Sequence, residues 1–272
     1  LFMDGASPST LTVGRDLIVT NQSALNLHSA PTNSAAATYG TLVSVGRDIC
    51  VYSNCYLKPW SHSTNGGSIL FRCKAFLVVT GGVVDANYTG FAGGVAANGF
   101  GPGGGQGTLY AGGGYGGAGG YAAGNYGKTY GSSNAPVDPG SGGGGGTGQR
   151  GGGLIRVEAN RVTLYGTLTA SDTAWSGHMV GSGSGGGIYL RCRSIEGNGV
   201  LRANGGNHFN GSSGSAGGGG RIAVWSSYDD FLFDTNRVTV KGGDSPEAAR
   251  WGQPGTIVWA RLPWPGTVIQ LR

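Results

Sequence analysis

The sequence predicts an all-β fold, a right-handed parallel β-helix of about seven coils with a long glycine-rich insertion. Glycine supplies 59 of the 272 residues without a Gly-x-y period, which excludes collagen. Short apolar runs alternate with period two, as expected of strands. Between Gly151 and Trp225, a unit of a glycine run, an apolar strand, a turn and a second strand recurs about every 33 residues.

The coils follow a short entry arm, residues 1–9. Two of them share the motif Val-Gly-Arg-Asp, in TLTVGRD from Thr10 and TLVSVGRD from Thr41. Steps of 32, 26, 86, 33, 34 and 35 residues separate the positions taken as matching, which are Leu11, Val43, Ile69, Ile155, Ile188, Ile222 and Ile257. The long step contains the insertion. The other steps suit a solenoid with two or three short strands per unit, because a four-stranded propeller blade needs a longer period.

Stacked coils place matching positions in rows about 4.8 Å apart. Two apolar rows are expected to fill the interior, one with Ile69, Ile155, Ile188 and Ile222 and the next with Phe71, Val157, Leu190 and Val224. A third row holds the small residues Cys73, Ala159 and Cys192. In this register Cys73 and Cys192 lie two coils apart, too far for a disulfide, and we expect buried thiols.

The other two cysteines, Cys50 and Cys55, flank Val-Tyr-Ser-Asn. They either bridge across a turn as a disulfide or are directed apart by the strand geometry. The sequence has neither a CxxC pair nor a Cys/His ligand spacing, so we expect no metal site.

Residues 90–153 form the glycine-rich insertion. It is either a flexible low-complexity loop or an ordered lobe docked on the β-helix. Recurring aromatic residues favour the lobe, and glycine-rich chains can pack closely as polyproline-II strands. Two shorter loops, residues 171–187 and 205–220, are expected at the same corner of later coils. We therefore treat residues 1–272 as a single domain.

Charge and composition limit the partners. The net charge of +5 comes from dispersed Lys and Arg, which favours solvated or ladder-forming arginines over nucleic-acid binding. The sequence has no apolar run long enough to span a membrane.

Low charge, abundant Gly, Ser, Thr, Asn and Tyr, and three glycosylation sequons favour an extracellular or cell-surface protein. The sequons begin at Asn21, Asn87 and Asn210. The ends, Leu1 and the strand-like TVIQLR, indicate a processed or excised piece of a longer protein.

At IYLRCRSIEGNGVLRANGG and GGGGRIAVW the chain resembles glycine-rich extracellular parallel β-helix repeat proteins. These include autotransporter-passenger-like adhesins and related surface proteins of microbes and protists. The resemblance covers about residues 10–90 and 151–260. It implies a right-handed β-helix with a cell-surface structural or adhesive role, and it implies no catalytic residues.

Candidate chemistry is sparse. Asp16 and Asp48 share a repeat position beside Arg15 and Arg47, either as an acid/base pair or as a turn ladder that caps backbone N–H groups. We favour the ladder and expect no catalytic residues and no cofactor. The aromatic residues of the loops have two possible roles. They either stack on glycans or are buried at a protein interface, or they pack onto the β-helix. They are Trp60, Tyr110, Tyr115, Tyr121, Tyr126, Trp175 and Trp251.

The sequence therefore predicts a secreted structural or adhesive protein without enzymatic activity. Open strand edges favour head-to-tail self-association into a fibre or surface appendage, and other surface proteins or glycans are further partners. A carbohydrate-active β-helix enzyme and a glycan-binding module are the alternatives. An ice-binding module ranks last, because Thr-x-Thr occurs only in isolated places.

Overall fold

The computed structural model describes residues 8–120, 126–172, 179–209, 213–227 and 231–262. In these residues two parallel sheets enclose one hydrophobic core, and helical structure is limited to three short 3-10 turns. The turns are η1 (Gly107–Leu109), η2 (Thr235–Arg237) and η3 (Ala248–Arg250). The predicted all-β fold of parallel strands is confirmed.

The larger sheet has ten strands. Its main path runs β1–β4–β7–β9–β11–β13–β16, while β2 pairs with β5, β5 also pairs with β7, and β14 pairs with β11. Neighbouring strands therefore come from successive repeats. The strands are β1 (Ser9–Val13), β2 (Leu17–Val19), β4 (Thr41–Val45), β5 (Asp48–Val51), β7 (Ile69–Val78), β9 (Leu154–Leu164), β11 (Gly187–Gly197), β13 (Arg221–Ser226), β14 (Phe231–Phe233) and β16 (Thr256–Arg261).

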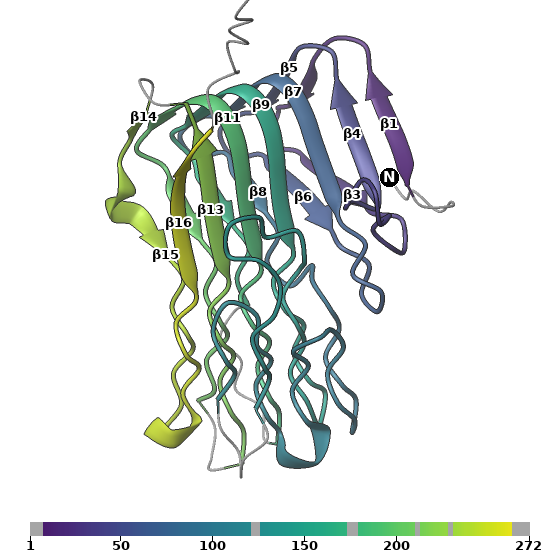
Figure 1. Cartoon of the computed structure of the whole chain (residues 1–272), viewed down its shortest axis with the longest axis vertical. Coiled ribbons are helices and arrows are strands. Elements are labelled where there is room, and N and C mark those ends of the chain that lie inside the picture. Colours follow the sequence, from purple (N-terminus) through teal and green to yellow (C-terminus); the bar gives the residue numbers. More distant parts are fainter. Residues whose placement is uncertain (1–7, 121–125, 173–178, 210–212, 228–230, 263–272) are drawn as a thin grey trace, which may run out of the picture.

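The smaller sheet follows the same succession in the order β3–β6–β8–β10–β12–β15. In Figure 1 the strands of both sheets occupy the upper part of the molecule, and their colours run from purple β1 to yellow β16 across the stack. The strands are β3 (Ala24–His28), β6 (Tyr56–Trp60), β8 (Val83–Asp85), β10 (Thr167–Thr169), β12 (Val200–Arg202) and β15 (Val238–Thr239).

The interior rows follow the predicted register in the later repeats. Ile155 pairs with Ile188 and Ile188 with Ile222, and the row two residues on pairs Phe71, Val157, Leu190 and Val224 in turn. All of these side chains are at most 1% exposed. Period-two alternation sends every second side chain inward, so identical apolar positions stack and exclude water.

The register of the second repeat differs from the expectation. Val43 pairs with Phe71, and Thr41 occupies the position beside Ile69. Leu11 pairs with Val43 and therefore belongs to the Phe71 row as well. A shift of two residues keeps the same side chains facing inward, so alternation alone does not distinguish the two registers.

The cysteines are all free. The disulfide considered between Cys50 and Cys55 does not form. Cys50 lies between the buried Ile49 and Val51 and faces outward, whereas Cys55 is fully buried. Cys73 and Cys192 flank Ala159 in the predicted small-residue row, where burial raises the pKa of both thiols to about 12.

The glycine lobe consists of the described parts of residues 90–153, 171–187, 205–220 and 241–255. In Figure 1 these segments extend downward from the sheets as long, closely paired chains. Backbone hydrogen bonds of 2.8–2.9 Å link the segments in sequence, from Gly152 to Ser184, from Gly185 to Gly218 and from Gly219 to Gln253. The insertion and the later loops therefore form one hydrogen-bonded layer.

Glycine is required in this layer because the chains approach too closely for a side chain. A Cβ atom on Gly217 would overlap the carbonyl oxygen of Gly183, and one on Gly143 would overlap that of Gly181. Collagen uses the same absence of a side chain to bring polyproline-II chains together. Steric contact, more than turn geometry, explains why glycine is concentrated here.

Candidate functional site

Asp16 immediately precedes β2 and Asp48 begins β5, so the two residues occupy matching positions in adjacent repeats, as predicted. The Asp48 N–H donates to Asp16 Oδ1 at 3.2 Å, and Arg47 Nε lies 3.6 Å from the same oxygen. In the next repeat Ala75 occupies the matching position. The contacts match a turn ladder, in which one carboxylate accepts a backbone N–H and pairs with an arginine. The described residues contain no group of three or more His, Cys, Asp and Glu that could hold a metal ion.

The loop aromatic residues differ widely in exposure. Tyr115 is fully buried, so its proposed place at a glycan or protein interface is wrong. Tyr126 and Trp251 are 46% and 48% exposed and remain accessible, and Tyr110 is half-buried. The remaining two candidates, Tyr121 and Trp175, lie outside the described residues.

Trp60 lies in a polar cavity of about 330 Å³ at the end of β6. Its ring stacks on His28 with centroids 5.2 Å apart, and the Arg150 guanidinium lies 5.5 Å from the ring centroid. Because His28 and Arg150 already contact the ring, Trp60 has little free surface for stacking on a sugar.

Of the sequons, Asn21 is exposed at a turn with φ 58°. Asn87 is half-buried, and its Oδ1 accepts from Thr169 Oγ1 at 2.8 Å and from the Ser171 N–H at 2.7 Å. Since these bonds hold the amide inside the fold, the structure disfavours glycosylation at Asn87. Asn210 lies outside the described residues.

An unexpected buried cluster joins β13 to the glycine lobe. The Arg221 side chain is 7% exposed; its Nε and Nη2 donate to Tyr130 O at 3.0 and 2.8 Å, and its Nη1 donates to Thr256 Oγ1 at 3.1 Å. The guanidinium also lies 5.4 Å from the centroid of the Tyr115 ring. Sequence reasoning missed this cluster. The available signal was an arginine at the junction between a glycine run and an apolar strand.

Asp138 lies in the electrostatic environment of this cluster. Burial raises the pKa of the Asp138 carboxyl, and the attraction of Arg221 offsets only part of the rise. Burial also raises the pKa of the Tyr115 phenol. Burial therefore shifts both groups toward their neutral forms, which agrees with a structural role inside the fold.

We expect Asp138→Asn to stabilise the protein at pH 7 and to have little effect near pH 3. A raised folded-state pKa means that stability is greatest below the unfolded value of about 3.9 and falls as the pH rises through the folded value. The asparagine side chain of the variant does not ionise, so the variant avoids this loss of stability at higher pH. Thermal unfolding of both proteins from pH 3 to 7 tests it; a Tm difference that does not change with pH would contradict it.

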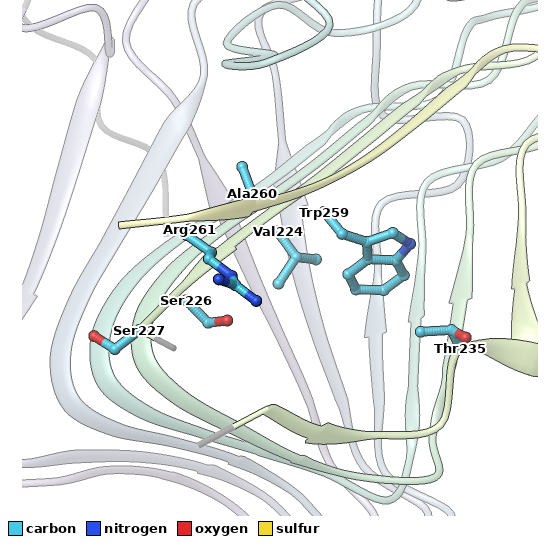
Figure 2. A pocket seen from close by; sticks show the side chains of 7 residues that line it. All are labelled: Val224, Ser226, Ser227, Thr235, Trp259, Ala260 and Arg261. Atoms are coloured by element: carbon cyan, nitrogen blue, oxygen red, sulfur yellow. The ribbon is translucent and has the colours of Figure 1, made fainter. Parts of the chain in front are cut away.

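At one end of the stack the interior rows reach solvent. In β16, Ile257 and Trp259 continue the rows of Ile222 and Val224, yet they are 39% and 37% exposed. Figure 2 shows Trp259 beside a cavity of about 380 Å³. The described residues that line it are Val224, Ser226, Ser227, Thr235, Trp259, Ala260 and Arg261.

At the other end of the stack, three strands are edge strands, each hydrogen-bonded to a neighbouring strand on one side. β1, β2 and β3 pair with β4, β5 and β6, and within the described chain no strand lies on their opposite sides. The backbone N–H and C=O groups of these strands therefore include a set directed away from the fold. Such edges are templates for pairing with another strand.

No family model, curated protein or solved structure matches the chain. Among the described residues, no helix is long and apolar enough to cross a membrane.

Proposed function

We propose that this chain is a secreted structural or adhesive protein, a subunit or segment of an extracellular fibre or surface appendage. In this proposal the repeats wind as a right-handed parallel β-helix, the hand that parallel crossover connections favour. The observation that carries the proposal is the pair of dissimilar ends. One end presents strand edges of both sheets, and the other presents a sheet end with partly exposed Ile257 and Trp259.

Assembly follows from joining these two ends. If β1, β2 and β3 of one copy met β16, β14 and β15 of a second copy, both parallel sheets would continue and the interior rows would be covered. Because the two surfaces differ, the contact is heterologous and propagates as an open filament unless the rotation closes a ring. The Asp16 carboxylate, which accepts from the Asp48 N–H and pairs with Arg47, supports a scaffold in preference to a catalyst.

The assembly is expected to stop when proline is placed on the open edges. Ser9 N–H donates to Gly40 O and Gly46 N–H to Val13 O, so the alternating N–H of Thr12 points away from β4. By the same alternation, with Tyr56 N–H bound to Ser23 O, the Ala24 N–H points away from β6. A Thr12→Pro/Ala24→Pro protein keeps its internal bonds and presents an edge that cannot donate there.

Analytical ultracentrifugation and negative-stain electron microscopy over a range of concentrations measure the outcome. We expect filaments or concentration-dependent oligomers of the parent protein and monomers of the proline variant. Thr12→Val/Ala24→Val is the matched control and should still assemble, because it keeps both N–H groups. A parent protein that remains monomeric at high concentration would refute assembly through the ends.

A further inference from the structure

A row of polar side chains, four of them cationic, follows one corner of the larger sheet. We call it the corner row: Arg15, Arg47, Lys74, Asn160 and Arg193. Its members occupy consecutive repeats, because Arg47 N–H donates to Arg15 O at 2.8 Å and Lys74 N–H to Arg47 O at 2.7 Å. Asn160 and Arg193 continue it between the paired rows on either side. All five side chains are exposed.

A shallow groove runs beside the corner row. Its floor is the small-residue row of Cys73, Ala159 and Cys192, and the opposite wall is the row of Arg72, Glu158 and Arg191. A cavity of about 290 Å³ lies here, lined by residues of both walls and the floor. The parallel register therefore builds an elongated groove with charged walls.

Positive charge dominates this corner. Glu158 is shared by Arg72 and Arg156, with N–O distances of 2.7 and 3.6 Å. Lys74, Arg161, Arg191 and Arg193 have no carboxylate within 4.0 Å among the described residues. The region holds seven cations against three carboxylates, an excess of four in a chain of net charge +5: Arg15, Arg47, Arg72, Lys74, Arg161, Arg191 and Arg193 against Asp16, Asp48 and Glu158.

Stacking like charges in register has an energetic cost, and in the corner row it falls on the first three members, which are all cationic. Elsewhere another side chain separates the cations, Asn160 in the corner row and Glu158 in the opposite wall. Adjacent strands are about 4.8 Å apart, and like charges directly opposite each other destabilise a sheet. A bound anion would offset this repulsion. A polymer with an anionic group on successive units would offset it along the row, and guanidinium groups bind carboxylate and sulfate in bidentate geometry.

We propose that this groove binds an acidic polysaccharide, with carboxylate or sulfate groups of the polymer paired to Arg191 and Arg193. A polysaccharide fits better than a nucleic acid, because single-stranded nucleic acids are held by aromatic side chains on which bases stack. The described residues that line the cavity are arginine, glutamate, asparagine, cysteine, alanine and Leu262, and none of them has an aromatic ring.

The proposal gives the adhesive role a class of ligand. It rests on the proposed function only in the assumption that the protein meets the polysaccharide outside the cell. Binding to a single copy does not require assembly. It is therefore measured on monomers of the Thr12→Pro/Ala24→Pro protein, so that failure of binding and failure of assembly are separate results.

The test compares two double variants with equal loss of charge. Arg191→Gln/Arg193→Gln removes the groove cations, whereas Arg202→Gln/Lys241→Gln removes two exposed cations at or beyond β12. Each protein is titrated by calorimetry with polygalacturonate oligomers of increasing length, with neutral dextran as the blank. We expect at least about a tenfold loss of affinity for the groove variant and a change within about twofold for the control.

Two further measurements separate specific binding from net charge. Arg193→Lys keeps the charge but loses the bidentate geometry, so we expect an intermediate affinity. Affinity should rise with oligomer length and fall with salt, because exposed charge pairs are screened. Circular dichroism and Tm values equal to the parent verify that each variant is folded.

Several results would overturn the proposal. Equal losses in the two double variants would mean attraction to net charge alone. No binding of polygalacturonate or of a sulfated polysaccharide by the folded parent would exclude this ligand class. Tighter binding of single-stranded oligonucleotides than of either polysaccharide would assign the groove to nucleic acid instead.

Discussion

Gly217→Ala is expected to destabilise the protein by about 3 kcal/mol or more, with a Tm lower by about 6–12 °C. The added Cβ would overlap the Gly183 carbonyl, which is backbone and has no rotamer to relieve the contact. Displacing Gly183 would also strain the bond from its N–H to Asp172 Oδ2, 2.7 Å long and buried. Chemical denaturation and thermal unfolding measure the loss.

Gly14→Ala is the matched control. An added Cβ there has no atom within 4 Å, and its φ is outside the left-handed region. We expect no loss of stability, or a gain of about 0.4–1 kcal/mol from a less flexible unfolded chain. Similar effects at both glycines would show that the lobe does not depend on close contact between its chains.

The contrast between these glycines shows how far the sequence leads. Glycine abundance and the alternating runs predicted the parallel sheets and the rows of Ile188 and Leu190, because both signals act between residues close in sequence. The register near Val43 was wrong by two residues, since alternation has a period of two. Composition does not show which carbonyl each lobe glycine contacts, because those partners lie in distant segments.

Whether a candidate functional feature could be predicted also depends on whether its signal lies within one segment or arises only between distant segments. The Asp16–Asp48 ladder was predictable, because a shared Val-Gly-Arg-Asp motif places both residues at one turn. The corner groove was not, because dispersed arginines show no charge run along the chain and gather only when repeats stack. Tyr115 was misplaced for the opposite reason: a tyrosine between glycines has no local signal of burial, and its neighbours come from β13 and the insertion.

Arg221→Met is expected to destabilise the fold by at least about 3 kcal/mol. The variant keeps an unbranched side chain of similar length but removes the hydrogen bonds to Tyr130 O and Thr256 Oγ1 and the charge over the Tyr115 ring. The Tyr130 carbonyl is partly buried, and a carbonyl that loses a charged donor in such a place is costly to leave unpaired. Since these contacts join β13 to the insertion, we expect faster hydrogen exchange around Tyr130.

Arg202→Met provides the comparison, because Arg202 is exposed on β12 and its loss should change stability by less than about 0.5 kcal/mol. Hydrogen exchange followed by mass spectrometry, together with urea denaturation, reads both effects. If Arg221→Met loses stability while exchange around Tyr130 stays slow, the arginine supports the sheet alone. If neither quantity changes, the docking of the lobe depends on the glycine contacts without Arg221, and the buried guanidinium is dispensable.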